Sequence, residues 1–560
     1  MPPVTTRVVQ LLAAGALASA ASFSNPIFSG FHPDPSCAFV PEWNNTFLCT
    51  TSSFLIFPGL PIYASQDLVH WRHVSYALSR PEQLPALEFL ARGATSGIYA
   101  PTLRYHDGKF YILTTLADQA LPGQNHTRWD NFVLTAQNPF ESESWSDPVP
   151  FDFPGIDPSP FWDDPTGTAW FTGSVDGAQD YHVPIDLATG ETGPAQTHQR
   201  VWNGTGLPSP EAPRLYRRQA DGRLYLVLAE GGTRERHRAV MGARARRRGA
   251  LGAVPAQPRP DGVRGRVVVL PGRRARGPVP GRGGPVVGRG GPWRWRTAPA
   301  AATRRTRTMP ISPWGGETVL TPVKWEEGGW PEFAPVSGTM DGDFALPEPA
   351  ADDAFAHLTP DKRAPLRVGS DDAIDFAPGS TLPPHLFHWR LPVAKHYAVS
   401  PPERPRDAAT FLACKQAHTR FRFSVDVEWW GKDDERRNMA REDQEVGVTA
   451  LLDQSQHFDL GIVMLKTDNG GGGGAGADVA PHMRFRGIST TPFRLPERMK
   501  WVDEQFPFAQ GVVESRWRRC RRTHSTAGRG SEHDALCILS RPRSAWCRRM
   551  RHRNDRLWAL

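Results

Sequence analysis

Short hydrophobic runs recur between residues 25 and 233, and Pro, Gly, Asn or Asp bounds each of them. Four stretches share one pattern, in which an X-Pro pair is followed by an apolar run, a polar turn and a second, aromatic run. They are DPSCAFVPEWNNTFLC, APTLRYHDGKFYILTT, DPSPFWDDPTGTAWFTG and APRLYRRQADGRLYLVLAE. Two apolar runs of this length separated by a turn predict a β-hairpin.

The four stretches follow one another at nearly constant spacing. Their prolines are 66, 57 and 55 residues apart, at Pro35, Pro101, Pro158 and Pro213. A step of this length accommodates one four-stranded antiparallel sheet, and no helical periodicity intervenes. The pattern therefore predicts an all-β fold, a β-propeller whose blades surround a central channel. Proline is tolerated at the first residue of a strand, so each X-Pro pair is expected to head an innermost strand and to face the channel.

Three of these four strand heads contain a carboxylate, namely Asp34, Asp157 and Glu211. Acids that converge on one pocket are unfavourable unless chemistry uses them. Taken singly, an Asp-Pro pair is more often a turn former. The common phase of the three acids within the repeat favours a catalytic site over three unrelated turns.

A different pattern follows the repeats. In TRFRFSVDVEWW, Phe421, Phe423, Val425, Val427 and Trp429 alternate with other residues, and EVGVTALLD, HFDLGIVML and MRFRGIS are further strand candidates. Alternation with period two over several strands predicts sheets with one buried face. We therefore expect a C-terminal β-sandwich over residues 321–513, after a propeller domain at 21–320.

The N-terminus has the layout of a secretory signal peptide over residues 1–20, with Arg7 before an apolar run and a small-residue cleavage pattern. A short anchor helix is the alternative. No later segment is long and apolar enough to span a membrane. Sequons at Asn44, Asn125 and Asn203 fit export, and Cys37 and Cys49 are close enough to pair in an oxidising compartment. We expect a secreted, extracellular protein.

The net charge of +8 is confined to two basic islands. Residues 234–307 contain twenty Arg and two acids, and residues 514–560 contain thirteen Arg and four acids, with no Lys in either. The rest of the chain is therefore strongly acidic. A basic chain usually implies an anionic partner, but this distribution argues against a nucleic-acid-binding protein.

The chain resembles glycoside hydrolase family 43 through NPIFSGFHPDPS, SSFLIFPGLPIYASQDLVHW, GIYAPTLRYHDGKFYI, DPSPFWDD and EAPRLYRRQADGRLYLVLAEGGT, in the family's order. The resemblance implies a five-bladed propeller and an inverting hydrolase of β-xylosides or α-L-arabinofuranosides that needs no cofactor, and it leaves open whether the central channel holds a calcium ion. It implies that Asp34 is the general base and Glu211 the general acid. Asp157 would be the third acid, which tunes and orients Glu211.

The same resemblance places Phe54 and Tyr99 as walls of the sugar pocket, and Thr233 among the substrate-binding residues. Aromatic faces suit the C–H surface of a sugar ring. The alternative is that both aromatics belong to the cores of the blades. Tyr99 stands where many relatives have Trp, and Ala212 where Gly is common, which bears on substrate choice.

A fifth blade is expected to begin near residues 270–280, where the first basic island lies. Moving the frame of residues 271–289 by one base permits QAVGHADLFPDAEGRWWGV, which has the strand, turn and aromatic pattern of the other repeats and the family's usual GHADL element. We therefore hypothesise that residues 234–308 are out of frame and disordered, and that a second frame loss makes 514–560 an aberrant tail without the last strands of the sandwich. The competing hypothesis is a disordered basic insert that binds RNA.

The sequence thus predicts a secreted, inverting exo-glycoside hydrolase that removes terminal β-D-xylosyl or α-L-arabinofuranosyl residues from hemicellulose. The alternative is an inactive propeller that binds glycans. The expected partner is an oligo- or polysaccharide, with no nucleic acid and no membrane, and the sequence assigns no oligomeric state.

Overall fold

The computed structural model describes residues 21–244 and 316–505, with gaps, and four further strands at 267–269, 293–298, 512–521 and 534–543. Within these residues the regular structure is β-strand apart from short 3-10 turns, which confirms the all-β expectation. No helix in the described part of the chain is long and apolar enough to cross a membrane. The turns are Pro41–Trp43, Pro81–Gln83, Pro85–Glu88, His126–Arg128, Ser142–Ser144, Ala195–Thr197 and Ala356–Leu358. The expected signal peptide, residues 1–20, lies outside the described residues.

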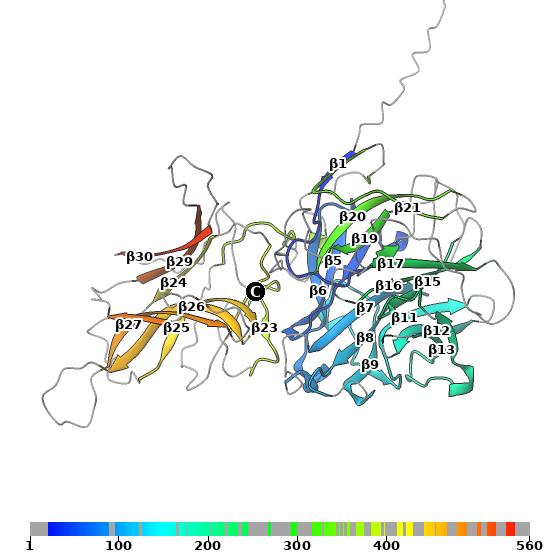
Figure 1. Ribbon diagram of the computed structural model, residues 1–560, viewed down its shortest axis with the longest axis horizontal. Helices are drawn as coiled ribbons and strands as arrows, with labels where there is room; N and C mark the ends of the chain where they lie inside the picture. The colour runs from blue at the N-terminus through cyan, green and yellow to red at the C-terminus, as the bar shows by residue number, and fades with distance from the viewer. Residues whose placement is uncertain are drawn as a thin grey trace, which may run out of the picture.

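Three four-stranded antiparallel sheets follow one another along the first part of the chain (Figure 1). The first contains β2 (Ser36–Val40), β3 (Thr46–Thr50), β5 (Gly59–Ser65) and β6 (Arg72–Leu78). The second contains β7 (Gly97–His106), β8 (Lys109–Ala117), β9 (Trp129–Ala136) and β10 (Val149–Phe151). The third contains β11 (Ile156–Asp163), β12 (Thr168–Val175), β13 (Gln179–Pro184) and β14 (Gln199–Trp202).

Two further sheets continue the series. The fourth contains β15 (Glu211–Arg217), β16 (Leu224–Glu230) and β17 (Arg238–Arg244). The fifth contains β18 (Val267–Val269), β19 (Trp293–Ala298), β20 (Glu317–Lys324) and β21 (Glu332–Phe333). In each of the first four sheets, the first two strands form the hairpin that the repeat predicts.

The sheets contact one another in a closed order. Strand β2 lies against β7, β7 against β11 and β11 against β15, and β18 contacts both β16 and β2. The apolar cores repeat this order. Separate clusters lie between the first and second, second and third, third and fourth, and fourth and fifth sheets, and another joins Phe47 and Tyr63 of the first sheet to Leu320 of the fifth. Neighbouring sheets therefore bury their apolar faces against each other all the way round.

The N-terminal segment joins the first sheet to the fifth. Phe28 forms a β-bridge with Thr318 of β20, and the side-chain amide of Asn25 donates to the Leu320 carbonyl at 2.9 Å. Strand β1 (Ala21–Ser24) pairs with β22 (Thr339–Gly342). These contacts correct the expected domain boundary between residues 320 and 321, because that boundary falls inside β20, and the fifth sheet continues to Phe333.

The expectation of disorder from residue 234 also needs correction. Strand β17 pairs with β16 along its whole length, and Ala239, Val240 and Met241 are buried. A run of consecutive apolar residues next to a strand with a buried face is sufficient for pairing despite the flanking arginines. Strands β18 and β19 also come from the segment 234–308, and its residues outside β17, β18 and β19 lie outside the described part.

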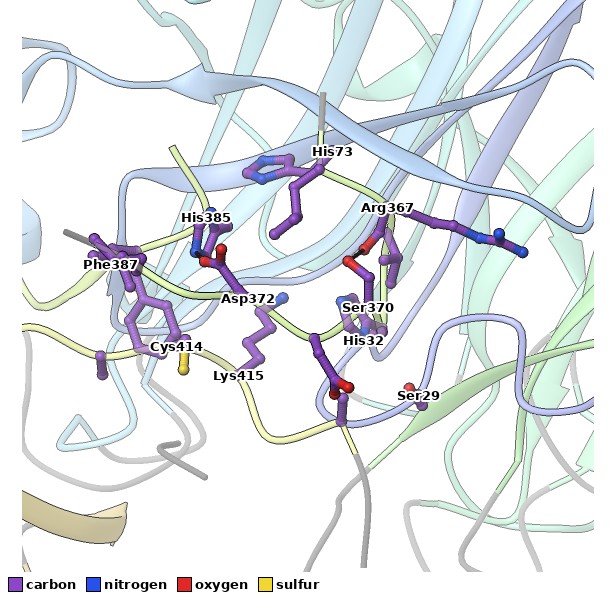
Figure 2. Close-up of a pocket in the computed structure, with 18 of the residues that line it drawn as sticks. Ser29, His32, His73, Arg367, Ser370, Asp372, His385, Phe387, Cys414 and Lys415 are labelled. Atoms are coloured by element: carbon purple, nitrogen blue, oxygen red, sulfur yellow. Dashed lines mark hydrogen bonds and ion pairs between the residues drawn. The ribbon is translucent and has the colours of Figure 1, made fainter. Parts of the chain in front are cut away.

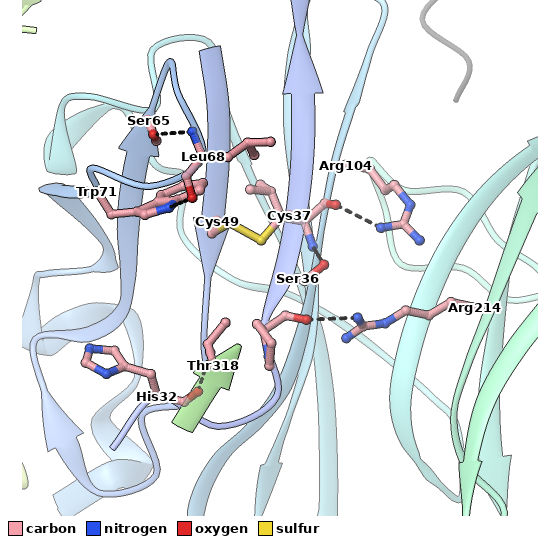
Figure 3. Close-up of a disulfide and its surroundings, with 12 residues drawn as sticks. His32, Ser36, Cys37, Cys49, Ser65, Leu68, Trp71, Arg104, Arg214 and Thr318 are labelled. Atoms are coloured by element: carbon pink, nitrogen blue, oxygen red, sulfur yellow. Dashed lines mark hydrogen bonds between the residues drawn. A yellow bond between two sulfur atoms is a disulfide. The ribbon is translucent and has the colours of Figure 1, made fainter. Parts of the chain in front are cut away.

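A disulfide links the two strands of the first hairpin, as Figure 3 shows. Cys37 of β2 and Cys49 of β3 are direct partners in the antiparallel register, so the expected pairing is confirmed. Both half-cystines are buried in the cluster between the first and fifth sheets.

The C-terminal part contains two antiparallel sheets (Figure 1). One has β25 (Glu445–Asp453), β26 (Gln456–Lys466), β27 (Val479–Ser489) and β28 (Trp501–Gln505). The other has β24 (Arg422–Glu428), β29 (Val512–Arg521) and β30 (Asp534–Arg543). Phe423 and Val425 of β24 pack against the cluster of Val448 and Leu460 in the first of these sheets.

The two ends of the expected alternating run, Phe421 and Trp429, lie outside the described residues. The expectation of a tail without strands from residue 514 is wrong. Strand β29 continues to Arg521, and β30 pairs with it over ten positions. Backbone hydrogen bonds form this ladder, so an arginine-rich composition alone does not exclude it.

Candidate active site

The four X-Pro pairs lie at or near the starts of β2, β7, β11 and β15, and they share an unusual backbone conformation. The residues before the prolines have φ values of 55°, 33°, 59° and 52° at Asp34, Ala100, Asp157 and Ala212. This left-handed region is uncommon for residues other than glycine and is found at functional sites. In β7, β11 and β15 the pairing register also shifts at this point. Such bulges re-aim side chains, so each strand head projects away from its own ladder.

Asp34 is held by a hydroxyl from the first sheet. Ser52 Oγ donates to Asp34 Oδ2 at 2.6 Å, and Ser52 Oγ itself accepts a hydrogen bond from the Ala100 backbone N–H at 2.7 Å. The Asp34 side chain is partly exposed, whereas Ser52 is fully buried. The carboxylate is therefore fixed in orientation while it remains open to water, and it is linked to the head of β7.

Asp157 and Glu211 are buried, with 2% and 8% of their surfaces exposed. Asp180 of β13 lies within electrostatic reach of both. Burial raises the pKa of Asp180 well above its usual value, a hydrogen bond from Ser174 opposes this, and the charges of Asp157, Glu230 and Glu211 raise it further. The protonated form of Asp180 is therefore favoured, within electrostatic reach of two of the predicted catalytic carboxyl groups.

Glu230 differs from Asp34, Asp157 and Glu211 in that hydrogen bonds from a tryptophan and a threonine hold its carboxylate. It accepts hydrogen bonds from Trp202 Nε1 at 2.7 Å and from the Thr205 backbone N–H at 2.9 Å, and it also bonds the Thr205 hydroxyl. Three donors satisfy much of the acceptor capacity of a carboxylate. We therefore assign Glu230 to the support of the loop after β14.

Arg214 ties together the heads of three sheets. Its guanidinium, on a side chain that is 3% exposed, donates to the Pro35 carbonyl at 3.0 Å and to the Pro101 carbonyl at 3.3 Å. Figure 3 shows Arg214 extending from β15 toward β2. Pro35 follows Asp34, and Arg214 lies three residues after Glu211. The heads that contain the predicted base and the predicted acid are thus joined by one side chain.

Phe54 and Tyr99 lie side by side near these heads. Their ring centroids are 5.1 Å apart, and Phe31 lies 5.4 Å from Phe54. Gln119 Nε2 donates to the Tyr99 hydroxyl at 2.7 Å, and Arg128 in turn donates to Gln119 Oε1 at 2.6 Å. Both aromatic side chains are partly exposed, unlike the aromatics of the blade cores. They form a wall that a sugar ring could contact.

The sequence pattern pointed to the three acids and both aromatics, which remain predictions, and it did not point to Asp180 or Arg214. The sequence does contain a signal for Arg214. The residue after the X-Pro pair is Ser36, Thr102 or Ser159 in the other three repeats, and only this repeat has a long cationic side chain there. The predicted substrate-binding residue Thr233 lies outside the described residues. Among the residues that the structure describes, no group of three or more His, Cys, Asp or Glu side chains is placed to hold a metal ion.

Comparison with known proteins gives the family. The model for glycosyl hydrolases family 43 matches residues 23–331. The chain is 39% identical over 222 residues to the non-reducing end alpha-L-arabinofuranosidase BoGH43B of Bacteroides ovatus, covering 39% of this chain and 38% of that protein. It is 35% identical over 229 residues to a xylosidase/arabinosidase of Butyrivibrio fibrisolvens, covering 38% and 40%. These matches span less than half the length of each relative.

Solved structures resemble a larger part of the chain. The structure described as Bacteroides ovatus Xyloglucan PUL GH43B has a TM-score of 0.65 at 24% identity, covering 93% of this chain and 92% of that one. A xylan beta-1,4-xylosidase from Bacillus halodurans has a TM-score of 0.63 at 22% identity, covering 92% of each. At these identities the likeness concerns the fold. With the family match over more than half of its residues, the chain belongs to glycosyl hydrolases family 43.

Proposed function

We propose that this protein is an inverting exo-glycosidase that removes terminal β-D-xylosyl or α-L-arabinofuranosyl residues from hemicellulose. The observation that carries the proposal is the shared placement of Asp34, Asp157 and Glu211 at the starts of the first strands of three sheets, in the family to which the chain belongs. Arg214 and Asp180 link these heads through hydrogen bonds and charge.

The architecture proposed for this activity is a five-bladed β-propeller followed by a β-sandwich. The closed order of sheet contacts and the apolar cluster between the first and fifth sheets support the propeller. The packing of Phe423 and Val425 against the facing sheet supports the sandwich. In a propeller, the starts of the inner strands all lie at one end of the central channel and form a single pocket there. Such a pocket can hold the end of a polysaccharide chain, which suits an enzyme that removes terminal sugars.

The proposed mechanism uses two carboxyl groups on opposite faces of the sugar ring whose glycosidic bond is cleaved. Asp34, open to water and oriented by Ser52, removes a proton from the attacking water. Glu211 donates its proton to the leaving oxygen, and attack from the opposite face inverts the anomeric carbon. Inverting hydrolases hold the two carboxyl groups about 6.5–9.5 Å apart, which leaves room for that water. Asp157 orients Glu211 within the acidic cluster.

The names of the relatives support the substrate class, because they describe arabinofuranosidase and xylosidase activities, one of them at the non-reducing end. Phe54 and Tyr99 are the proposed walls for the terminal sugar. The signal-like N-terminus supports secretion, as does the Cys37–Cys49 disulfide, because disulfides persist in oxidising compartments.

We also propose that the coding frame is shifted within the arginine-rich part of residues 245–308. The composition, rich in Arg, Gly, Pro and Ala, supports this proposal. Resequencing the coding DNA tests it, and a read that reproduces the present frame would overturn it.

Hydrolysis of 4-nitrophenyl β-D-xyloside and α-L-arabinofuranoside tests the proposed function. We expect turnover by the full chain expressed in the verified coding frame, and we expect Asp34→Asn and Glu211→Gln each to lower kcat by roughly 10²- to 10⁴-fold. Asp147→Asn is the matched control, since this carboxylate is 81% exposed and pairs with Arg80. Sugar binding without turnover by the unaltered chain would favour the glycan-binding alternative, and full activity in both variants would overturn the assignment.

A further inference from the structure

A cavity of about 140 Å³ lies at the seam between the first sheet and the later part of the chain (Figure 2). The lining includes Tyr63 of β5 and Tyr76 of β6, together with residues of three later segments, 366–374, 385–387 and 412–417. Asp34, Asp157, Glu211, Phe54 and Tyr99 do not line it. It is therefore separate from the proposed site of hydrolysis.

One wall of the cavity is a continuous row of four rings. The centroid separations are 5.4 Å from His32 to Tyr63, 5.3 Å from Tyr63 to His73 and 4.5 Å from His73 to Tyr76. All four side chains are at least nine-tenths buried. Phe387 also lines the cavity. Aromatic surfaces of this kind favour a ligand with a flat or apolar body.

Lys415 brings a single ammonium group into this apolar environment. Its Nζ is shielded from solvent and has no hydrogen-bond partner within the part of the chain that the structure describes. Burial lowers the pKa of Lys415 to about 7. A buried ammonium without a partner is unfavourable, and an anion placed beside it would restore the lost stabilisation.

The other charged groups around the cavity do not provide that anion. Asp372 already pairs with His385, whose Nε2 lies 2.6 Å from Asp372 Oδ2. Burial, followed by the charge of Lys415, lowers the pKa of His32 and of His73, the latter to about 3. Both imidazoles are therefore neutral near pH 7. Arg367 and Asp371 also line the cavity and have opposite formal charges.

We propose that this cavity binds a small monocarboxylate with an apolar body, with the Lys415 ammonium as its counter-charge and the row of rings as its wall. The volume is close to that of an engineered cavity of about 150 Å³ that binds benzene. A single ammonium matches one negative charge. A dianion would leave excess charge beside Asp371 and Asp372, which disfavours phosphate.

Binding requires protonated Lys415, so the affinity depends on pH in a defined direction. A carboxylate stays ionised above pH 6, whereas the free amine loses its proton as pH rises through 7. Tyr63 and Tyr76 have raised pKa values and stay neutral in this range. We expect affinity at least tenfold lower at pH 9 than at pH 7, and proton uptake on binding at pH 8. The proposal assigns the pH dependence to Lys415, so this dependence should persist in His385→Gln.

Isothermal titration calorimetry of the full chain with benzoate and with its neutral isostere benzamide tests the proposal. We expect benzoate to bind, with at least tenfold weaker binding of benzamide and of xylose. Lys415→Met should abolish benzoate binding, whereas Lys466→Met, at a lysine that is 59% exposed on β26, should leave it unchanged. Equal binding of benzoate and benzamide, or unaltered binding in Lys415→Met, would overturn the proposal.

Two measurements on the unaltered chain do not depend on the folding of a variant. Titrations at pH 8 in buffers of different ionisation enthalpy report protons taken up on binding. Binding of benzoate without proton uptake contradicts the assignment. The absence of any heat of binding up to 10 mM benzoate also contradicts it, because this concentration covers the weak affinities that a single ion pair supports.

Discussion

Replacement of Arg214 by Met tests how the strand heads are held together. The change removes two hydrogen bonds from a buried guanidinium to the carbonyls of Pro35 and Pro101. Hydrogen bonds to charged groups each contribute about 1.5–3 kcal/mol, so their joint loss corresponds to about 3–6 kcal/mol. Methionine avoids the desolvation cost of a buried guanidinium, and this offsets part of the lost free energy. We expect a decrease of about 3 kcal/mol in the free energy of unfolding.

Urea unfolding, followed by tryptophan fluorescence, measures this change. Arg217→Met is the matched control on the same strand, because Arg217 is partly exposed and lies 5.9 Å from the Phe161 ring. A cation–π contact of this kind contributes about 0.5–1 kcal/mol. The control should therefore unfold close to the unaltered protein.

The Arg214 variant should also lose activity at temperatures where it remains folded. Arg214 fixes the carbonyl that follows Asp34, so its loss allows the proposed base to shift relative to Glu211. Misplacement of a catalytic group by about 1 Å costs about 100-fold in rate. An Arg214→Met protein with an unchanged unfolding midpoint and unchanged kcat would refute the role of this side chain as the link between the heads.

Three further predictions concern individual side chains. Reduction of the Cys37–Cys49 disulfide, which closes a loop of sequence separation 12, should lower the free energy of unfolding by roughly 3 kcal/mol in urea titrations with and without reductant. Because the pKa of Asp180 is raised in the folded protein, ionisation of this group lowers the free energy of unfolding as pH rises above about 4. The difference in free energy of unfolding between Asp180→Asn and the unaltered chain should therefore shift in favour of the variant from pH 4 to pH 7. An equal difference at both pH values would contradict this prediction. Phe54→Ala should lower kcat/KM for both nitrophenyl glycosides roughly 10- to 100-fold with little change in unfolding, and unchanged kinetics would exclude it from the sugar pocket.

The repeat was predictable because its period is carried by local chemistry. Proline at the start of each inner strand and a polar turn after it are visible in a single sequence, and they located the heads of β2, β7, β11 and β15. The three acids followed from that phase. The Cys37–Cys49 pair followed from spacing within one hairpin.

Contacts between distant strands were not predictable in this way. Asp180 lies in β13, where no local pattern shows that its carboxyl group is buried beside Asp157 and Glu211. The two hydrogen bonds of Arg214 span 179 and 113 residues of sequence. Lys415 likewise meets His32 and His73 only because the later segments return to the first sheet.

The errors at the arginine-rich segments have a common cause. Composition describes side chains, whereas strand pairing depends on backbone donors and acceptors that every residue except proline provides. Strand β17 was missed because three buried residues, Ala239, Val240 and Met241, lie among arginines. Strands β29 and β30 were missed because the tail was judged by charge alone.

The anomer first released from 4-nitrophenyl β-D-xyloside is the most direct test of the pairing of Asp34 and Glu211 as base and acid on opposite faces of the sugar. Proton NMR during the first minutes of hydrolysis separates the two anomers before they interconvert. The account predicts that α-xylose appears first and that its signal later decays toward the equilibrium mixture. Initial release of β-xylose would contradict the account, because it would require attack on the sugar by an enzyme carboxylate in place of water.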